Sequence, residues 1–243
     1  MNRVKEFCNK IHLLSTSRSQ HEVFVDFCEI SALSLRQPFE KSPENEQRYH
    51  EILKRYPEKA TIAFADLLGI VVLALEEQPR DFLGECYHAL ELHNQYKGQF
   101  FTPYHVSMTM AEIALQGIED HIKAKGYVTL NEPCCGSGAM VIAAYEILKK
   151  RNINPTSSMW VVAQDIDHKC CCMAYIQMTL LAIPGVVVWG DTLILENREQ
   201  WLTSGFYLYP WSSRLKKEIK QKEESVHLEE KRPEVFGQLE FDL

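Results

Sequence analysis

The sequence predicts an α/β protein in which a parallel, doubly wound sheet follows an N-terminal helical domain. Two observations support this fold class. In the first 95 residues, apolar positions recur at the spacing of amphipathic helices. From residue 126 onward, short Val-rich runs alternate with helical segments of about 12–16 residues, which is the pattern of parallel strands joined by crossover helices.

The N-terminal part contains four expected helices, in residues 21–35, 44–56, 58–78 and 80–96. The third includes the longest apolar run, residues 60–75, which is 16 residues long and contains Asp66. A membrane span needs about 20 apolar residues. We therefore expect a buried helix near the centre of a bundle and no membrane association. Asp66 should lie beside a polar partner or at the edge of the bundle.

The second part contains three expected strands, in residues 126–133, 157–167 and 185–193, and three helices, in residues 106–124, 138–151 and 168–183. The stretch after Trp211 is charged and low in apolar residues, so we expect a solvated helix or a disordered tail there. The expected domains are residues 1–95, 96–212 and 213–243. A sheet this short would have an edge that is exposed or covered by a partner.

Composition limits the classes of function. The chain has 243 residues and a net charge of −7, which argues against a protein that coats nucleic acid nonspecifically but does not exclude a local basic groove. Its eight cysteines include no C-x-x-C pair, so the usual spacing of a zinc site is missing. We expect reduced thiols in a cytoplasmic protein.

The loop after the first expected strand combines an acid with two glycines. Ligands of such sheets bind where the strands end. Glu132 precedes Gly136 and Gly138, which would let a ligand approach the backbone at the start of a helix. Val141 stands where the dinucleotide fingerprint has its third glycine. The acid disfavours a pyrophosphate and favours a ligand with a cationic amino group; a tight turn with two glycines is the structural alternative.

Acids also follow the second and third strands. Asp165 is placed to accept both hydrogen bonds of a ribose diol, whereas Asp167 would cap the next helix. Asp191 could accept a hydrogen bond from an exocyclic adenine amine. Solvent-facing acids at a helix start, or an Asp that only stabilises a turn, are the alternatives. Three acids at successive strand ends favour a shared site.

His168, Cys171 and Cys172 share one face of the helix after the second strand, by their i, i+3, i+4 spacing. A metal site is one interpretation of this spacing. Packing of small cysteines between the helix and the sheet is the better one, so we expect no metal.

Four motifs carry a family resemblance. GQFFTP, EPCCGSGAM, AQDID and GDTL, in this order within residues 98–193, resemble those of the adenine-N6 DNA methyltransferases of the type I restriction-modification modification-subunit group. The resemblance implies a Rossmann-like S-adenosylmethionine-dependent methyltransferase fold in residues 96–212, with a truncated parallel sheet. S-adenosylmethionine is then the expected cofactor.

The resemblance also assigns the cofactor-binding residues. The side of the site would be lined by Phe101, Thr102 and Pro103. Glu132, in place of the family's Asp, would meet the methionine amino group, while Gly136 and Gly138 would allow close approach. Asp165 would hold the ribose and Asp191 the adenine.

The chain departs from the family at the catalytic motif, [DNS]-P-P-[YFW]. In that motif an Asn or Asp side chain accepts a hydrogen bond from the N6 amine of a flipped-out adenine, and the aromatic ring stacks on the base. The nearest match is LYPW, in which Pro210 and Trp211 fit but Leu208 and Tyr209 do not. A Leu side chain cannot accept a hydrogen bond. A strand end with a buried Trp is the structural alternative.

Two functions are consistent with these expectations. The first is an S-adenosylmethionine-binding enzyme of the DNA adenine-N6 methyltransferase class. It would methylate DNA as a single chain, together with a protein partner, or as a homo-oligomer. The second is a catalytically silent subunit that keeps the cofactor pocket and regulates or assists a partner. The complete set of pocket residues favours the first, and Leu208 together with the short sheet favours the second.

Overall fold

The computed structural model describes residues 2–92 and 101–230, and the side chains of residues 2–92 and 101–220. Its internal contacts divide the chain into two compact units, Met1–Tyr209 and Pro210–Leu243. The first unit holds both the N-terminal helices and the sheet. In its described part, the second unit consists of helix α12 (Trp211–Glu230). The three-part division suggested by the sequence stays a prediction.

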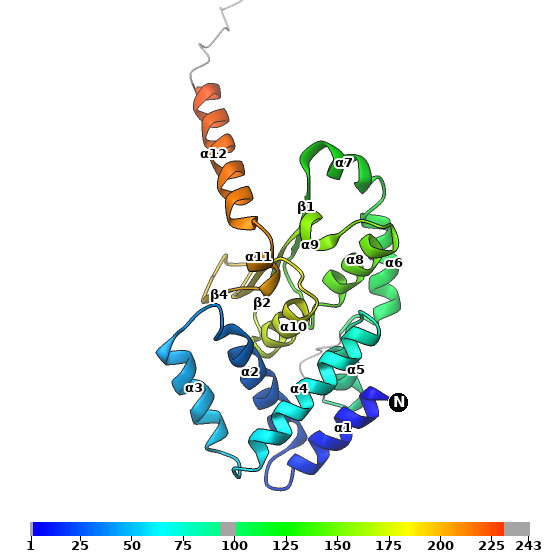
Figure 1. Cartoon of the computed structure of the whole chain (residues 1–243), viewed down its shortest axis with the longest axis vertical. Coiled ribbons are helices and arrows are strands. Elements are labelled where there is room, and N and C mark those ends of the chain that lie inside the picture. Colours follow the sequence, from blue (N-terminus) through cyan, green and yellow to red (C-terminus); the bar gives the residue numbers. More distant parts are fainter. Residues whose placement is uncertain (1, 93–100, 231–243) are drawn as a thin grey trace, which may run out of the picture. The chain divides into compact units, whose positions relative to one another are not determined.

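Five helices make up the described N-terminal part (Figure 1). They are α1 (Arg3–Leu14), α2 (Gln20–Arg36), α3 (Pro43–Leu53), α4 (Ala60–Glu77) and α5 (Phe82–Ala89). Polar side chains fix four of their starts, and Asn2 caps α1 by accepting the N–H of Lys5. Ser19 and Glu22 form a capping box on α2. Ser42 caps α3 and Asp81 caps α5, each by accepting a backbone N–H of the first turn.

Helix α4 lies at the surface of this bundle. Phe64 and Leu67 are buried, whereas Ile62 on another face is 69% exposed. The expected position at the centre of the bundle is therefore wrong. Asp66 is exposed and forms an ion pair with Lys10 of α1 at 2.7 Å, which confirms the expected polar partner. None of the helices in the described ranges is long and apolar enough to cross a membrane.

The described chain forms a four-stranded sheet in the order β1-β2-β3-β4. The strands are β1 (Val128–Glu132), β2 (Met159–Asp165), β3 (Gly185–Trp189) and β4 (Glu199–Leu202). The first three pair in parallel, which confirms the predicted fold class. The last pairs antiparallel with β3. No sequence pattern predicts β4, because its four residues are too few to show an alternation.

Helices α8 (Ala139–Lys150) and α10 (His168–Leu180) connect the parallel strands. Helix α8 contacts β1, and α10 contacts β2, β3 and the N-terminal helices α2, α4 and α5. Cys170, Cys171 and Cys172 are all buried in α10. Their small side chains let α10 pack tightly between sheet and bundle, so the strand ends are connected to the N-terminal helices through this helix.

Four short helices complete the first unit: α6 (Tyr104–Ala114), α7 (Ile118–Lys125), α9 (Pro155–Ser158) and α11 (Ser204–Leu208). The sequence predicts one helix over residues 106–124, but α6 and α7 are separate. Gly117 lies between them with φ of +69°. Glycine enters this left-handed region without a Cβ penalty, so the chain turns here instead of continuing the helix.

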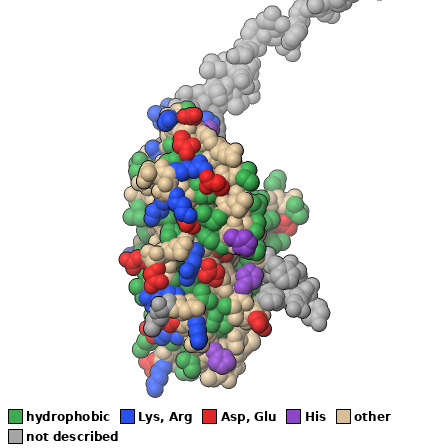
Figure 2. Space-filling view, turned by 90° about the vertical axis from the view of Figure 1, so that its right-hand side faces the viewer, with side chains coloured by type: hydrophobic (Ala, Val, Ile, Leu, Met, Phe, Trp, Pro, Cys, Tyr) green, Lys and Arg blue, Asp and Glu red, His purple; other side chains and the backbone are tan. Residues whose placement is uncertain are grey.

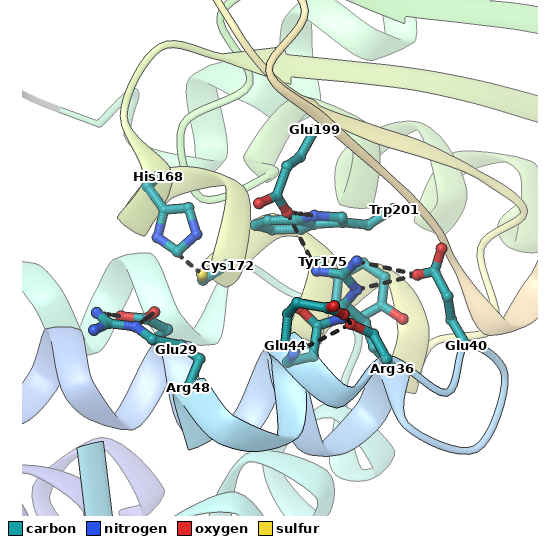
Figure 3. Close-up of polar contacts among 12 residues, drawn as sticks. Glu29, Arg36, Glu40, Glu44, Arg48, His168, Cys172, Tyr175, Glu199 and Trp201 are labelled. Atoms are coloured by element: carbon teal, nitrogen blue, oxygen red, sulfur yellow. Dashed lines mark hydrogen bonds and ion pairs between the residues drawn. The ribbon is translucent and has the colours of Figure 1, made fainter. Parts of the chain in front are cut away.

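A polar cluster joins α2 and α3 to α10 and β4 (Figure 3). The Arg36 guanidinium lies 4.9 Å from the ring centroid of Trp201 and pairs with Glu199 at 3.5 Å. Trp201 Nε1 donates to the same Glu199 carboxylate at 2.7 Å. Arg48 donates to both oxygens of Glu29, at 2.6 and 3.0 Å. Because these charges satisfy one another, we assign the cluster a structural role at the sheet edge.

Candidate functional site

A cavity of about 350 Å³ lies where β1 and β2 end. Small-molecule sites typically have volumes of about 300–1,000 Å³. Its walls come from the segment before α6, from α6 itself, from the loop after β1 with the start of α8, and from the end of β2 with the start of α10. The lining residues are Phe101, Thr102, Met110, Glu132, Cys134, Cys135, Gly136, Ser137, Ala139, Met140, Asp165 and Cys170.

Residues 133–138, which we call the glycine loop, connect β1 to α8. Gly136 and Gly138 have φ of +53° and +95°, a region that residues with a Cβ rarely adopt. A Cβ on Gly136 would also come within 3.1 Å of the Phe101 ring. Helix α8 begins directly after Gly138 without a side-chain cap, so its first N–H groups have no partner within the helix. At Gly136 the loop therefore presents backbone groups to the cavity with no side chain to cover them.

Asp165 fastens the glycine loop to the end of β2. Its Oδ2 accepts the N–H of Gly136 at 2.8 Å, and its Oδ1 accepts the N–H of Asp167 at 2.9 Å. Asp167 in turn caps α10 by accepting the N–H of Lys169 at 2.9 Å, which confirms its expected capping role. A carboxylate has about four lone-pair positions, so Asp165 keeps acceptor capacity for the hydroxyl groups of a ligand.

Two carboxyl groups make the cavity acidic. Burial raises the pKa of both Glu132 and Asp165, and backbone N–H groups partly oppose this shift. The charge of Asp165 raises the pKa of Glu132 further. Lys169 pairs instead with Asp167 at 3.3 Å and donates to the Tyr87 hydroxyl at 3.1 Å. Within the described ranges neither cavity carboxylate forms a salt bridge, so a cationic ligand would complement them.

The segment before α6 forms an aromatic wall. Phe101 is 8% exposed, and its ring centroid lies 5.0 Å from that of Tyr87 in α5. Phe101 and Thr102 line the cavity, whereas Pro103 is not among the lining residues and immediately precedes α6. Residues 98–100 of the GQFFTP motif lie outside the described residues.

Asp191 follows β3 and is not among the residues that line the cavity. Its carboxylate accepts the N–H of Leu193 at 2.9 Å, which stabilises the local turn. The neighbouring Thr192 donates its hydroxyl to the carbonyl of Pro133, at 2.7 Å. The turn after β3 thus touches the glycine loop, while the contact of Asp191 with an adenine stays a prediction.

Residues 78–229 match the family model described as N-6 DNA methylase, and this range is more than half of the chain. The chain belongs to the N-6 DNA methylase family. The matched range includes α5, the whole cavity and the sheet. This agrees with the family resemblance of the four sequence motifs. No curated protein sequence matches the chain.

Two solved structures are similar to this N-6 DNA methylase chain at low identity. One is described as a class I S-adenosylmethionine-dependent methyltransferase from Listeria monocytogenes, with 13% identity and a TM-score of 0.45, over 78% of this chain and 52% of that one. The other is the methyltransferase subunit of a type I restriction-modification system from Streptococcus thermophilus, with 22% identity and a TM-score of 0.40, over 77% of this chain and 43% of that one. The chain spans about half of their length.

The residues nearest to the methylase catalytic motif fall at the junction of the two units. Leu208 ends α11 and is 66% exposed. Pro210 and Trp211 belong to the second unit, where Trp211 starts α12 and lies 5.3 Å from the Arg214 guanidinium. A catalytic role for Pro210 and Trp211 stays a prediction.

Sequence reasoning misses several lining residues of this methylase cavity. Cys134, Cys135 and Ser137 stand inside the EPCCGSG motif, so their place in the glycine loop is a usable signal. Met110 and Cys170 come from α6 and α10. The apolar spacing of a helix does not show which of its faces contacts a ligand, so the sequence gives no signal for these two residues.

Two of the cysteines at the cavity, Cys135 and Cys170, are protonated thiols. All eight cysteines lie within the described residues, and none of them forms a disulfide. Burial raises the pKa of Cys135 and Cys170, so both are protonated near neutral pH. Over the described ranges, no group of three or more His, Cys, Asp or Glu side chains is placed to hold a metal ion.

Proposed function

We propose that the cavity binds S-adenosylmethionine and that the chain belongs to a DNA adenine-N6 methyltransferase that acts on DNA together with a partner subunit. One observation carries the proposal. Glu132 and Asp165 line the same cavity of about 350 Å³, without a salt bridge to another described residue, beside two glycines of positive φ. When bound, S-adenosylmethionine supplies an activated methyl group on a cationic sulfonium centre.

The residues present fit this ligand. The cationic amino group complements the carboxylate of Glu132, and ribose hydroxyls can donate to Asp165, which keeps free acceptor capacity. Gly136 has no side chain to block the approach of a ligand to the backbone. Phe101 offers an aromatic surface to an apolar or aromatic part of the ligand.

The DNA substrate is proposed from membership of the N-6 DNA methylase family. Surface charge adds little support, since the chain carries a net charge of −7. On the face that Figure 2 presents, acidic and basic side chains are interspersed and do not gather by sign. Attraction to DNA depends largely on Lys and Arg contacts with phosphates. We therefore propose that a partner subunit supplies most of the DNA binding.

A separate observation favours a second function. Leu208 stands where the family has an amide or carboxylate, and its side chain has no hydrogen-bond acceptor. A chain that holds the cofactor but cannot polarise the adenine amine would be a catalytically silent cofactor-binding subunit. The two functions share the same pocket and differ only in methyl transfer.

Calorimetric titration of the full chain tests the shared pocket. S-adenosylmethionine should bind with one site per chain. ATP, which has the same adenosine but an anionic triphosphate, should not bind because the cavity is acidic. Absence of binding heat for S-adenosylmethionine, or equal affinity for ATP, would contradict the proposed function.

A further inference from the structure

A buried carboxylate of the N-terminal helices contacts the glycine loop directly. Asp81, at the start of α5, is 4% exposed. Its Oδ2 accepts the hydroxyl hydrogen of Ser137 at 2.5 Å. Its Oδ1 accepts the N–H of Gly84 at 3.0 Å and a side-chain N–H of Gln177 at 2.9 Å. One oxygen therefore caps the helix while the other holds the loop.

Gln177 of α10 completes the connection. It is fully buried, and its Nε2 donates to the carbonyl of Ser137 at 2.8 Å as well as to Asp81. Its Oε1 accepts the N–H of Leu83 at 3.1 Å. Both the side chain and the carbonyl of Ser137 are thus held from outside the loop, by residues that lie 56 and 40 positions away in the chain.

The local sequence is adapted to this carboxylate. A Cβ added at Gly84 would overlap the Asp81 carboxylate, so only glycine lets it sit at this place. A helix cap alone does not need a buried charge, since Ser or Asn caps as well as Asp does. Burial raises the pKa of Asp81, and the three donors that meet its carboxyl group oppose this rise.

Ser137 stands between the two glycines of positive φ and lines the cavity. The glycines allow the loop to adopt this shape. They also give the ligand-free loop many conformations, so the loop loses conformational entropy when a ligand binds. Contacts that fix the loop before binding lower that entropic cost. We propose that Asp81 is a positioning residue, which acts through Ser137 and Gln177 to hold the glycine loop in its ligand-binding conformation. The inference deepens the proposed function and rests on it for its effect on cofactor affinity.

The test uses Asp81→Asn in the full chain. Asn keeps an oxygen for Gly84 and Gln177, and therefore keeps the cap of α5, but it faces Ser137 with a neutral N–H, so the charge-assisted bond to the Ser137 hydroxyl becomes a weaker neutral one. Amide hydrogen exchange of peptides covering residues 133–140 in the ligand-free protein should become faster. The dissociation constant for S-adenosylmethionine should rise about fivefold to tenfold, the difference expected between a charge-assisted and a neutral hydrogen bond.

Two further variants separate positioning from general loss of stability. Ser42→Ala removes the cap of α3, where Ser42 accepts the N–H of Asn45 at 3.2 Å, and should leave loop exchange and cofactor affinity unchanged. Ser137→Ala removes the partner of Asp81 and carries the test if Asp81→Asn does not fold. The losses in the double variant Asp81→Asn/Ser137→Ala should be far smaller than the product of the single losses, because both act through one contact.

The outcomes distinguish this inference from the proposed function. Wild-type exchange rates of the glycine loop in Asp81→Asn and in Ser137→Ala would overturn the inference, whether or not the cofactor binds. Fully multiplicative losses in the double variant would overturn it as well. Failure of the wild-type chain to bind S-adenosylmethionine would contradict the proposed function alone, because loop exchange is measured without ligand.

Discussion

The carboxylate of Asp165 and the backbone N–H of Gly136 form a hydrogen bond of 2.8 Å, which joins the end of β2 to the loop after β1. Parallel neighbouring strands end at the same edge of the sheet, so the two chain segments meet although 29 positions separate them. A change at Asp165 therefore affects both the acceptor offered to a ligand and the loop that surrounds it.

Asp165→Ala should weaken S-adenosylmethionine binding by about 1.5–3 kcal/mol, because a charged acceptor for the ribose is lost. Calorimetry on both proteins measures the difference. Asp66→Ala is the matched control, since Asp66 is an exposed carboxylate that pairs with Lys10 away from the cavity. Equal affinities of wild type and Asp165→Ala would show that the ribose assignment is wrong.

Cofactor affinity should fall on acidification at a pH above the ordinary glutamate pKa of about 4.3. Burial, and then the charge of Asp165, raise the pKa of Glu132, so it loses its charge at a higher pH than an exposed Glu does. Titrations over a pH series should show a weaker and flatter dependence in Glu132→Gln. A Glu58→Gln control, which changes an exposed carboxyl outside the cavity, should retain the wild-type profile.

The titration of Glu132 should affect the free energy of unfolding in the direction opposite to its effect on cofactor affinity. The folded carboxyl of Glu132 keeps its proton to a higher pH than the unfolded one, so the folded state binds more protons in that interval. Raising the pH through the interval therefore lowers the free energy of unfolding. Urea unfolding of wild type and Glu132→Gln should show a smaller decrease in the variant; an identical decrease would contradict the raised pKa.

Gly138→Ala should lower the free energy of unfolding by about 1–2 kcal/mol through backbone strain. Gly138 has φ of +95°, and an added Cβ would make only ordinary contacts, 3.5 Å from Ala174. Gly69→Ala is a control of the same chemistry, because Gly69 lies in α4 with open space around its Cβ position. It should stabilise the protein by about 0.5–1 kcal/mol. A Gly138→Ala protein as stable as wild type would refute the strained loop.

The isolated chain should transfer methyl groups to DNA slowly or not at all. Leu208 cannot polarise the adenine amine, and a group of this kind is commonly worth about 10²–10³ in rate. Incubation with radiolabelled S-adenosylmethionine and adenine-rich duplex or single-stranded DNA measures the transfer. Robust incorporation that Asp191→Ala abolishes would show that the chain is active alone and that the amine acceptor lies elsewhere than position 208.

Much of the candidate site is predictable from sequence because its signals are local. Glycines that adopt positive φ and acids that follow strands can be recognised within a few residues. The parallel order of β1, β2 and β3 then brings Glu132, Gly136 and Asp165 to one edge. Asp191 follows β3 in the same way, and its side chain accepts the N–H of Leu193 in that turn, so its contact with an adenine stays a prediction.

The parts that escape prediction depend on tertiary contacts. Asp81 has the sequence signature of a helix cap, and nothing nearby indicates that its second oxygen meets Ser137. Gln177 is a polar residue in a helix that the sequence predicts only to pack against the sheet. Its role depends on the contact between α5 and α10. The break at Gly117 was hidden by apolar spacing that continues across it.

Photochemical labelling tests the central claim most directly, because it reports where the cofactor binds. The chain is irradiated with methyl-radiolabelled S-adenosylmethionine and digested with trypsin, which cuts after Lys125 and Lys149 and releases the glycine loop in one peptide. The label should appear in the peptide of residues 126–149, and excess S-adenosylhomocysteine should suppress it. Label confined to peptides that contribute no residue to the cavity would contradict the account.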